Sequence, residues 1–418
     1  MRNGSQRRAV ITGIGPITCI GTGREGLWRG IRAEKSGIRR ISTFDTTAFH
    51  AHCGGEIRDW IPEAHFPPHR LKRLDRYAQF AVASARMALE DSGLSYSRER
   101  PQHRVGVSFG TALGGIANAE DQHAHFLKKG TRGVNQTLAL QVFGGSAHSN
   151  IAIEFGFRGV GTTNSNSCAS GTVAVGEALR YIRDDFADVM IAGGAEAPLS
   201  PLTFGAFAII KTMSQATDDP AAACRPFDLL RDGFVMGEGA ASLVIEELEH
   251  ARRRGARIYA EVLGYSLNND AYHMTSPLPG GESCIRAMRD SLEDAQLAPE
   301  QIDYVNAHAS STQLNDSTET MALKEVFGKH AERMAVSGTK PFTGHPLGAT
   351  GAIEAAICAL AIEHKWLPPT LNREHLDPAC DLDVVPSHGR PAELTYVLSN
   401  SFGFGGINSC VVLGRFSE

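Results

Sequence analysis

This chain of 418 residues has little net charge, no paired cysteines and no long apolar runs. Its net charge of −5 provides no basic field that would attract nucleic acid. We find no apolar run long enough to cross a bilayer. The basic N-terminus, Met1–Arg8, precedes a segment that is too short and too broken by glycine for a secretory signal. We therefore expect a cytoplasmic protein that neither binds nucleic acid nor inserts into a membrane.

The eight cysteines are scattered along the chain, and none belongs to a C-x-x-C pair. This spacing argues against a structural zinc site, and we expect no metal. A disulfide framework is typical of small exported domains rather than of a large chain without an export signal. We expect most of the cysteines to be small buried side chains, with Cys168 as the exception because its neighbours are polar.

Apolar runs rich in Val, Ile and Ala alternate with amphipathic runs, which predicts a largely buried α/β sheet. The predicted strands are Arg8–Gly13, Arg104–Ser108, Val189–Ala192, Ala241–Glu246, Ile258–Ser266, Tyr304–Ala307, Met334–Ser337, Tyr396–Ser399 and Cys410–Leu413. The predicted helices are Leu74–Ser92, Ala169–Arg183, Cys284–Ala295, Thr318–Phe327 and Leu347–His364. A strand–turn–helix unit followed by a strand ending in a glycine pair occurs around Cys168 and again around His345, which hints at a duplicated fold.

Cys168 lies at the end of a run of small and polar residues, Gly161–Gly171. The run brings the thiol to the predicted first turn of a helix, where free N–H groups and the helix dipole favour a thiolate. The alternative is a buried core cysteine, but the flanking Asn and Ser residues are poor core material. We therefore predict that Cys168 is a nucleophile for acyl transfer through a thioester.

Two histidines occupy settings suited to proton transfer or to hydrogen bonding of a carbonyl oxygen. His308 follows a predicted strand into a polar turn, where catalytic groups of open α/β sheets gather, although an ordinary loop histidine fits equally well. His345 lies among small residues that allow close helix packing or close approach of a ligand. Lys340 and Glu354 could pair and orient this histidine, because their apolar, glycine-rich surroundings are unusual for surface charges.

Two further segments have alternative interpretations. The glycine-rich run Asn400–Asn408 is either a tight turn between the last two strands or a mobile aromatic gate in which Phe404 moves. The basic cluster Pro67–Arg76 opens a predicted helix. Taken alone, it is more simply a solvated helix face than a docking patch for an acidic partner.

Together, the segments around Cys168, His308, His345 and Asn400–Asn408 resemble the β-ketoacyl-acyl carrier protein (ACP) synthases. The resemblance is greatest to the elongating type II condensing enzymes, β-ketoacyl-ACP synthase II, and it extends over essentially the whole chain. It implies a thiolase fold, a duplicated five-layered α-β-α-β-α architecture, normally in a homodimer. Residues 1–255 would form the N-terminal half with the nucleophile, and residues 256–418 the C-terminal half with both histidines.

The resemblance also implies a decarboxylating Claisen condensation that needs no cofactor, because the substrates travel on the phosphopantetheine arm of acyl- and malonyl-loaded ACP. The implied catalytic residues are Cys168, His308, His345, Lys340 and Glu354. The implied oxyanion hole and gate comprise Cys168, Phe402, Gly403, Phe404 and Gly405. The implied substrate-binding residues are Leu113, Asp270, Thr275, Ser310 and Thr312. The implied carrier-docking residues are Lys72, Arg73 and Lys211, which favours the docking interpretation of the basic cluster.

The chain departs from the family pattern in three places. His308 is followed by Ala309 where the family usually has glycine, the nucleophile turn contains Asn166–Ser170, and Val134–His148 replaces a segment usually richer in Pro and Met. These departures lead to the hypothesis of specialised acyl specificity, with the chain length and pathway left open. A non-catalytic partner subunit of the chain-length-factor kind is the alternative, although such subunits typically lack the cysteine.

Overall fold

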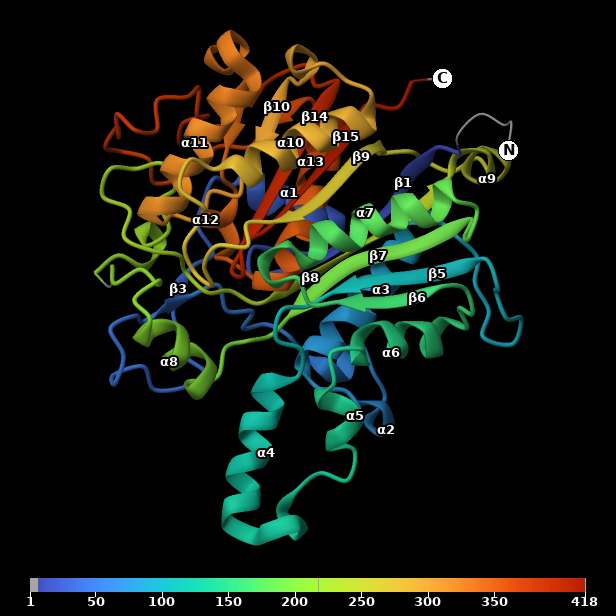
Figure 1. Cartoon of the computed structure of the whole chain (residues 1–418). Coiled ribbons are helices and arrows are strands. Elements are labelled where there is room, and N and C mark those ends of the chain that lie inside the picture. Colours follow the sequence, from blue (N-terminus) through green and yellow to red (C-terminus); the bar gives the residue numbers. More distant parts are fainter. Residues whose placement is uncertain (1–6, 217, 418) are drawn as a thin grey trace.

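A single large sheet runs through the protein in the computed structural model, which describes residues 7–216 and 218–417 (Figure 1). Most of the basic N-terminus, residues 1–6, lies outside the described residues. Strands from the N-terminal half are β1 (Ala9–Thr18), β5 (Val105–Gly110), β6 (Gly161–Asn164), β7 (Val189–Glu196) and β8 (Gly239–Glu247). Those from the C-terminal half are β9 (Ala260–Asn269), β10 (Tyr304–Asn306), β11 (Ala335–Ser337), β14 (Tyr396–Gly403) and β15 (Ile407–Gly414).

The two sets of strands have the same topology. The sheet order is β11-β10-β14-β15-β9-β1-β8-β7-β5-β6. When the five strands of each half are numbered in sequence, both halves have the order third, second, fourth, fifth and first from the sheet edge to the middle. In each half the third, second and fourth strands pair in parallel, while the fourth, fifth and first pair antiparallel. An antiparallel contact of β1 with β9 joins the halves. The duplication predicted from the sequence is confirmed.

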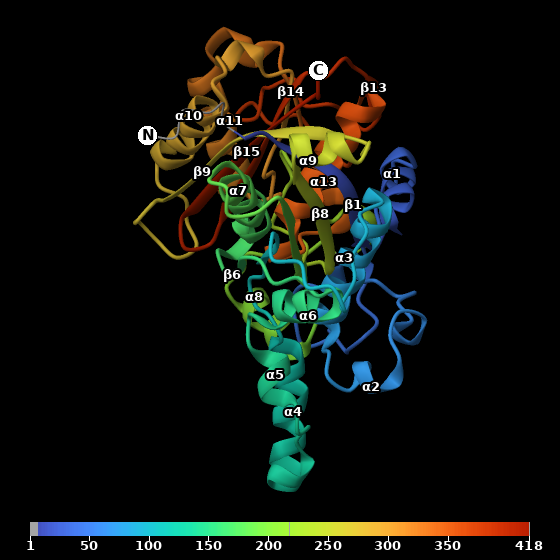
Figure 2. The ribbon, with the colours of Figure 1, turned by 90° about the vertical axis from the view of Figure 1, so that its right-hand side faces the viewer.

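Helices form the remaining layers (Figures 1 and 2). The central pair, α7 (Ser170–Arg183) and α13 (Thr350–His364), pack on each other and contact strands of both halves. The outer layer of the N-terminal half contains α3 (Arg76–Ser92) and α6 (Ser146–Phe155), and that of the C-terminal half contains α10 (Glu282–Ala295) and α11 (Gln313–Phe327). The two halves of the sheet provide the two β layers, so the layers follow in the order α-β-α-β-α that the resemblance implied.

The central helix corrects one expectation from the sequence. By length and composition, Leu347–His364 is apolar enough to cross a membrane, although we expected no such run. Because 89% of the segment is buried inside the protein, its apolar composition is that of a core helix.

The remaining elements connect these layers or project from them. They are β2 (Gly21–Thr22), α1 (Gly23–Arg32), β3 (Arg39–Arg40), β4 (Cys53–Gly54), η1 (Pro62–Ala64), α2 (Pro68–Leu71), α4 (Ile116–Lys129), η2 (Gly130–Gly133), α5 (Leu138–Val142), η3 (Ser167–Ala169), α8 (Pro201–Ile209), η4 (Pro220–Ala222), α9 (Leu248–Arg253), η5 (Pro299–Gln301), η6 (Gly328–Glu332), α12 (Lys340–Thr343), η7 (Leu347–Ala349), β12 (Trp366–Leu367) and β13 (Arg390–Pro391). The η elements are single turns of 3-10 helix.

All the predicted strands and helices are present, with shifted ends. Two ends shift equally and most: α11 begins at Gln313 rather than Thr318, and β1 continues through Gly13 and Gly15 to Thr18. A Cβ atom at Gly13 would lie 2.1 Å from the carbonyl oxygen of Ala88, and one at Gly15 would lie 2.1 Å from that of Ser84. Both glycines therefore allow α3 to pack against the strand, and they do not end it.

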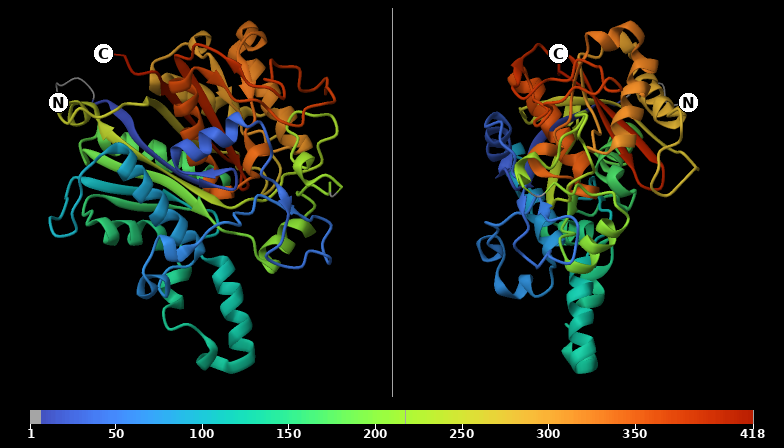
Figure 3. Two further views of the ribbon diagram at one scale, coloured as in Figure 1. Left: turned by 180° about the vertical axis from the view of Figure 1, so that it is seen from behind. Right: turned by 90° about the vertical axis from the view of Figure 1, so that its left-hand side faces the viewer.

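The segment from α4 to α5 forms an arm that projects from the body of the protein (Figures 1 and 3). It includes part of the unusual run Val134–His148. The arm exposes the large apolar side chains Phe126, Leu127, Leu140 and Phe143. The described residues therefore leave these apolar side chains uncovered.

Candidate active site

Cys168 lies in η3, the single turn that leads from β6 into α7. The preceding residue, Ser167, has a φ of 51°, so the chain bends sharply just before the thiol. The side chain of Cys168 is only 7% exposed. Burial raises the pKa of the thiol above its ordinary value, although Ser167, the backbone N–H of Phe404 and the charge of Lys340 lower it. Burial therefore works against the thiolate that the sequence led us to expect, and the resting thiol is protonated.

His308 follows β10 and begins a tightly constrained turn. Ala309 and Ser311 have φ values of 45° and 66°, in the left-handed region that non-glycine residues rarely adopt. The Glu319 carboxylate holds this turn by accepting hydrogen bonds from the backbone N–H of His308 at 2.8 Å and of Ala309 at 2.9 Å. It also accepts a hydrogen bond from the Asn400 side chain at 3.1 Å. Glu319 was not predicted from the sequence; it lies in the second turn of α11.

His345 is brought beside His308 by the turn between α12 and η7. The two ring centroids are 5.5 Å apart and the rings are nearly perpendicular, at 81°. The Nδ1 of His345 lies 2.9 Å from the Thr350 hydroxyl, a partner that the sequence did not reveal. Burial lowers the pKa of both histidines well below 6.5, and the nearby charge of Lys340 lowers it further. Both imidazoles are therefore neutral at physiological pH.

Lys340 and Glu354 form the predicted pair, with Nζ and Oε1 2.7 Å apart and both side chains almost fully buried. Nζ also donates to the backbone carbonyl of His308. The pair forms as predicted, but it supports the chain at His308 rather than orienting His345, whose ring contacts Thr350 instead. Burial raises the pKa of Glu354 to about 7, and the charge of Lys340 opposes this rise.

The predicted aromatic gate is a short connection between two long strands. β14 continues through Phe402 to Gly403, and β15 begins at Ile407. Gly405 and Gly406 have positive φ values of 86° and 73°, which the turn requires. The Phe404 ring stacks on Phe207 of α8, with centroids 6.2 Å apart.

The gate turn is tied to the neighbouring loop through Asp270. The backbone N–H of Asp270 donates to the Gly406 carbonyl at 2.7 Å, and its carboxylate accepts from the Asn408 side chain at 2.7 Å. Gly405 N–H also donates to the Met274 carbonyl at 2.7 Å. Asp270 therefore positions the loop, and its carboxylate is already engaged.

A cavity of about 370 Å³ unites most of the candidate residues. Its lining includes Cys168, Lys211, Asp270, Thr275, His308, Ser310, Thr312, His345, Phe402, Gly403 and Phe404. The Ser310 and Thr312 hydroxyls lie 2.9 Å apart. Lys340, Glu354, Gly405 and Leu113 are not among the lining residues. Leu113 instead packs against the apolar cluster that contains Cys168.

The basic cluster separates into two kinds of residue. Arg70 pairs with Glu154 at 3.0 Å, and Arg76 pairs with Glu238 at 2.7 Å, so these two stabilise the fold. Lys72 and Arg73 are exposed and form no ion pair with any described residue. They lie outside the cavity, whereas the exposed Lys211 lies at its lining.

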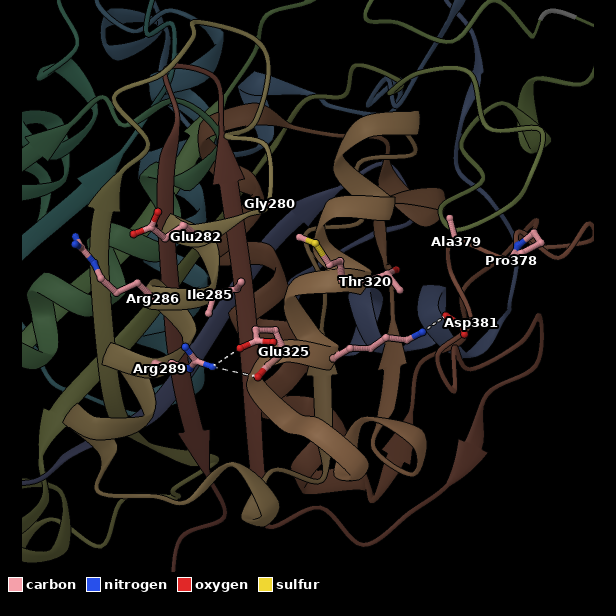
Figure 4. Close-up of a pocket in the computed structure, with 12 residues that line it drawn as sticks. Gly280, Glu282, Ile285, Arg286, Arg289, Thr320, Glu325, Pro378, Ala379 and Asp381 are labelled. Atoms are coloured by element: carbon pink, nitrogen blue, oxygen red, sulfur yellow. Dashed lines mark hydrogen bonds and ion pairs between the residues drawn. The ribbon is translucent and has the colours of Figure 1, made fainter.

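A larger depression of about 880 Å³ lies between α10 and α11 (Figure 4). Two ion pairs lie in its lining, Arg289 with Glu325 at 3.1 Å and Lys324 with Asp381. It contains none of the predicted site residues. Among the described residues there is also no cluster of three His, Cys, Asp or Glu side chains arranged to hold a metal. The smaller cavity around Cys168 is therefore the candidate active site, on the basis of its chemistry rather than its volume.

The cavity can support carbon–carbon bond formation through a thioester. A buried thiol and two neutral imidazoles line the same cavity, and such imidazoles can donate hydrogen bonds to a carbonyl oxygen as it gains charge. Gly403 leaves room beside the nucleophile, since a Cβ atom there would lie 3.1 Å from the Cys168 backbone nitrogen. The backbone N–H of Phe404 also faces the Cys168 thiol and lowers its pKa.

Comparisons with known proteins agree with this chemistry. The model of the β-ketoacyl synthase N-terminal domain matches residues 6–251, and that of the C-terminal domain matches residues 259–374. The 3-oxoacyl-[acyl-carrier-protein] synthase 2 of Coxiella burnetii is 43% identical over 410 residues, covering 98% of this chain and 99% of its own. The protein of the same name from Synechocystis sp. is 41% identical over 416 residues, covering 100% of both chains. A solved type II polyketide ketosynthase, in complex with its acyl carrier protein and bound to the hexaketide, has a TM-score of 0.91 and 34% identity, covering 99% of this chain and 100% of that chain.

Proposed function

The chain belongs to the β-ketoacyl synthase family, and we propose that Cys168, His308 and His345 carry out its decarboxylating condensation. It is a β-ketoacyl-acyl carrier protein synthase, an acyltransferase of the condensing-enzyme class. The observation that best supports these roles is the meeting of one buried thiol and two neutral imidazoles in a single cavity.

In the first half-reaction, the Cys168 sulfur attacks the thioester carbonyl of acyl-ACP. A new carbon–sulfur bond forms, the bond to the pantetheine sulfur breaks, and the released pantetheine thiol carries the proton that Cys168 loses. The N–H groups of Cys168 and Phe404 stabilise the oxyanion of the tetrahedral intermediate. Since the thiol is protonated at rest, proton transfer accompanies the attack.

In the second half-reaction, malonyl-ACP loses CO₂ and the electron pair of the broken bond forms an enolate. His308 and His345 donate hydrogen bonds to the enolate oxygen. The enolate carbon attacks the acyl thioester, the Cys168 thiolate leaves, and it takes up a proton from water. Decarboxylation supplies the driving force for the carbanion, so we propose that the reaction needs no cofactor. Lys340 and Glu354 position His308 through its backbone.

The rest of the cavity serves the substrate arm. Ser310 and Thr312 face the cavity together, and their hydroxyls suit the amide groups of phosphopantetheine. Thr275 lies in the loop that Asp270 ties to the gate turn. Leu113 forms part of the wall behind the nucleophile, where an acyl chain would extend.

The carrier protein is the proposed partner on the cavity side. A related ketosynthase has been solved with its acyl carrier protein, which supports this partner. Lys72, Arg73 and Lys211 are exposed cations suited to an acidic partner, and Lys211 lies at the cavity itself.

We also propose that the chain forms a homodimer and acts in the cytoplasm. β6 ends the order of the sheet, so one side of this strand is free to pair with a second copy. The apolar side chains of the arm would be covered in the same interface.

The alternative of a non-catalytic partner subunit is weaker, because the thiol and both histidines are present and assembled. The altered segments favour a specialised acyl range within the condensing enzymes. Val134–His148 belongs mainly to the projecting arm and the start of α6, and Ala309 lies directly beside His308.

Intact-mass analysis tests the proposal. Wild-type protein and Cys168→Ala are incubated with acyl-ACPs of graded chain length, and malonyl-ACP is then added. We expect an acyl adduct on the wild type alone, discharged as β-ketoacyl-ACP. If the wild type acquires no adduct with any chain length, the assigned role of Cys168 is wrong.

A further inference from the structure

Glu196 is a buried acid that the condensation itself does not use. It ends β7 and is fully buried. No lysine, arginine or histidine of the described residues forms an ion pair with it. A buried carboxylate without a cation is costly unless hydrogen bonds replace the lost water.

Four donors surround this carboxylate. Oε2 accepts from the backbone N–H of Ala112 at 2.6 Å and of Gly348 at 3.0 Å. Oε1 accepts from the backbone N–H of Leu113 and from the Thr111 hydroxyl, both at 3.0 Å. An ionised carboxylate is purely an acceptor with about four lone-pair positions, so this set of donors matches its charged form.

The donors come from two segments that serve different parts of the site. Thr111–Leu113 follows β5, and its Leu113 side chain packs against the apolar cluster around Cys168. Gly348 belongs to η7, the turn just after His345. A Cβ atom at Gly348 would lie 2.3 Å from the Ala112 nitrogen, so the two segments are in direct contact at this point.

We propose that Glu196 is a positioning residue that locks the acyl-tunnel wall at Leu113 to the turn behind His345, and thereby maintains the enzyme's discrimination between acyl chain lengths. This inference rests on the proposed function for the role of Leu113. The charged carboxylate holds the turn Thr111–Leu113 by its N–H groups, in the way that a backbone nest holds an anion. A protonated Glu196 could donate only to the Thr111 hydroxyl, and its O–H oxygen is a weaker acceptor for the Leu113 N–H, so this side of the lock loosens.

The pKa values of Glu196 and of its ionisable neighbours decide the pH range of the test and the control variant that it needs. Burial raises the pKa of Glu196 to about 7, although its hydrogen bonds lower it. Asp75, at the N-cap of α3, lies near enough for its pKa to be raised by Glu196, and burial raises that pKa to about 7 as well. Tyr77 and Cys168 are also close, and burial raises the pKa of each.

In Glu196→Gln an N–H₂ group replaces one acceptor oxygen and faces the groups that donate to the carboxylate. The variant therefore mimics the protonated acid at every pH. The experiment measures the rate of Cys168 acylation by acyl-ACPs of graded length, using intact mass. We expect the ratio between the best and the poorest chain to fall by about tenfold in Glu196→Gln. In the wild type the same ratio should fall as the pH is lowered through about 7, the pKa of Glu196. The ratio for Glu196→Gln should not change with pH.

Asp75→Asn is the matched control, since asparagine is an equally good N-cap and removes the neighbouring acid. It should keep the wild-type ratio and its pH dependence. Equal chain-length ratios in the wild type and Glu196→Gln would overturn the proposal. If Glu196→Gln does not fold, the pH dependence of the chain-length ratio still tests the proposal. A ratio that stays constant with pH in the wild type would overturn the proposal, and so would a pH dependence that disappears in Asp75→Asn. Failure of the proposed function is distinguishable, because the wild type would then acquire no acyl adduct.

Discussion

Replacing Lys340 by methionine removes one charge from a pair that is almost completely buried. Methionine keeps an unbranched stem, so the change mainly deletes the ammonium group. Its contacts with the Glu354 carboxylate, at 2.7 Å, and with the His308 carbonyl are lost. Breaking a buried pair leaves the remaining charge without compensation, which costs about 3–5 kcal/mol of the free energy of unfolding. The double variant Lys340→Met with Glu354→Gln removes both charges, and we expect it to recover most of that loss.

The pH dependence of stability distinguishes an orphaned charge from a simple packing defect. The folded-state pKa of Glu354 is already raised to about 7 by burial, and Lys340 is what limits the rise. Without Lys340 that pKa moves higher, while an unfolded glutamate titrates near about 4.3. Between these two values the folded state holds a proton that the unfolded state has released. The free energy of unfolding therefore falls by about 1.4 kcal/mol per pH unit in this window. In the wild type the contribution of Glu354 to the fall ends near pH 7, whereas in Lys340→Met it continues to higher pH.

Urea unfolding followed by tryptophan fluorescence, from pH 6 to about pH 9, measures both effects. The double variant serves as the control, because its glutamine does not titrate. Equal destabilisation of the single and double variants would show that the orphaned carboxylate is not the cause. A single variant whose stability did not change above pH 7 would refute the assigned role of Glu354.

Three further predictions test other contacts. Gly338→Ala should lower the free energy of unfolding by about 1–3 kcal/mol, because its Cβ would lie 2.5 Å from that of Ala309, and adding Ala309→Gly should restore most of the loss in thermal unfolding. Gly403→Ala should slow acylation of Cys168 by roughly tenfold or more in intact-mass kinetics, because its Cβ would crowd the Cys168 N–H at 3.1 Å, and an unchanged rate would count against that donor. Lys72→Glu should raise the KM for acyl-ACP about tenfold while leaving the rate with acyl-pantetheine unchanged, and equal effects on both substrates would argue against docking there.

The sequence was enough to single out three residues that one cavity brings together, because each lies in a local motif. Cys168, His308 and His345 occur in short polar or glycine-rich stretches that are unusual for a protein core. Alternation of apolar and amphipathic runs was likewise enough to locate the main strands and helices. The duplication needed only the order of those elements, which the sheet confirms.

The groups that hold the site together were not predictable in this way. Glu196 bonds to Gly348 across 152 positions of sequence, and nothing near either residue signals the contact. Glu319 and Thr350 likewise acquire their roles only when separate segments meet at the site. The pKa of Cys168 was misjudged for the same reason, since the helix end is a local property and burial is created by tertiary packing.

The placement of charge explains why two neutral histidines suit this reaction. Malonyl-ACP carries a carboxylate in its ground state, and a charged imidazolium would bind that carboxylate as well as the later enolate. Such an interaction would stabilise the substrate and oppose the loss of CO₂. Lys340 supplies a fixed positive charge that is satisfied by Glu354 and the His308 carbonyl, and it helps to keep both histidines neutral. The neutral N–H donors then interact most strongly with the oxygen that becomes negative during decarboxylation, which is where stabilisation increases the rate.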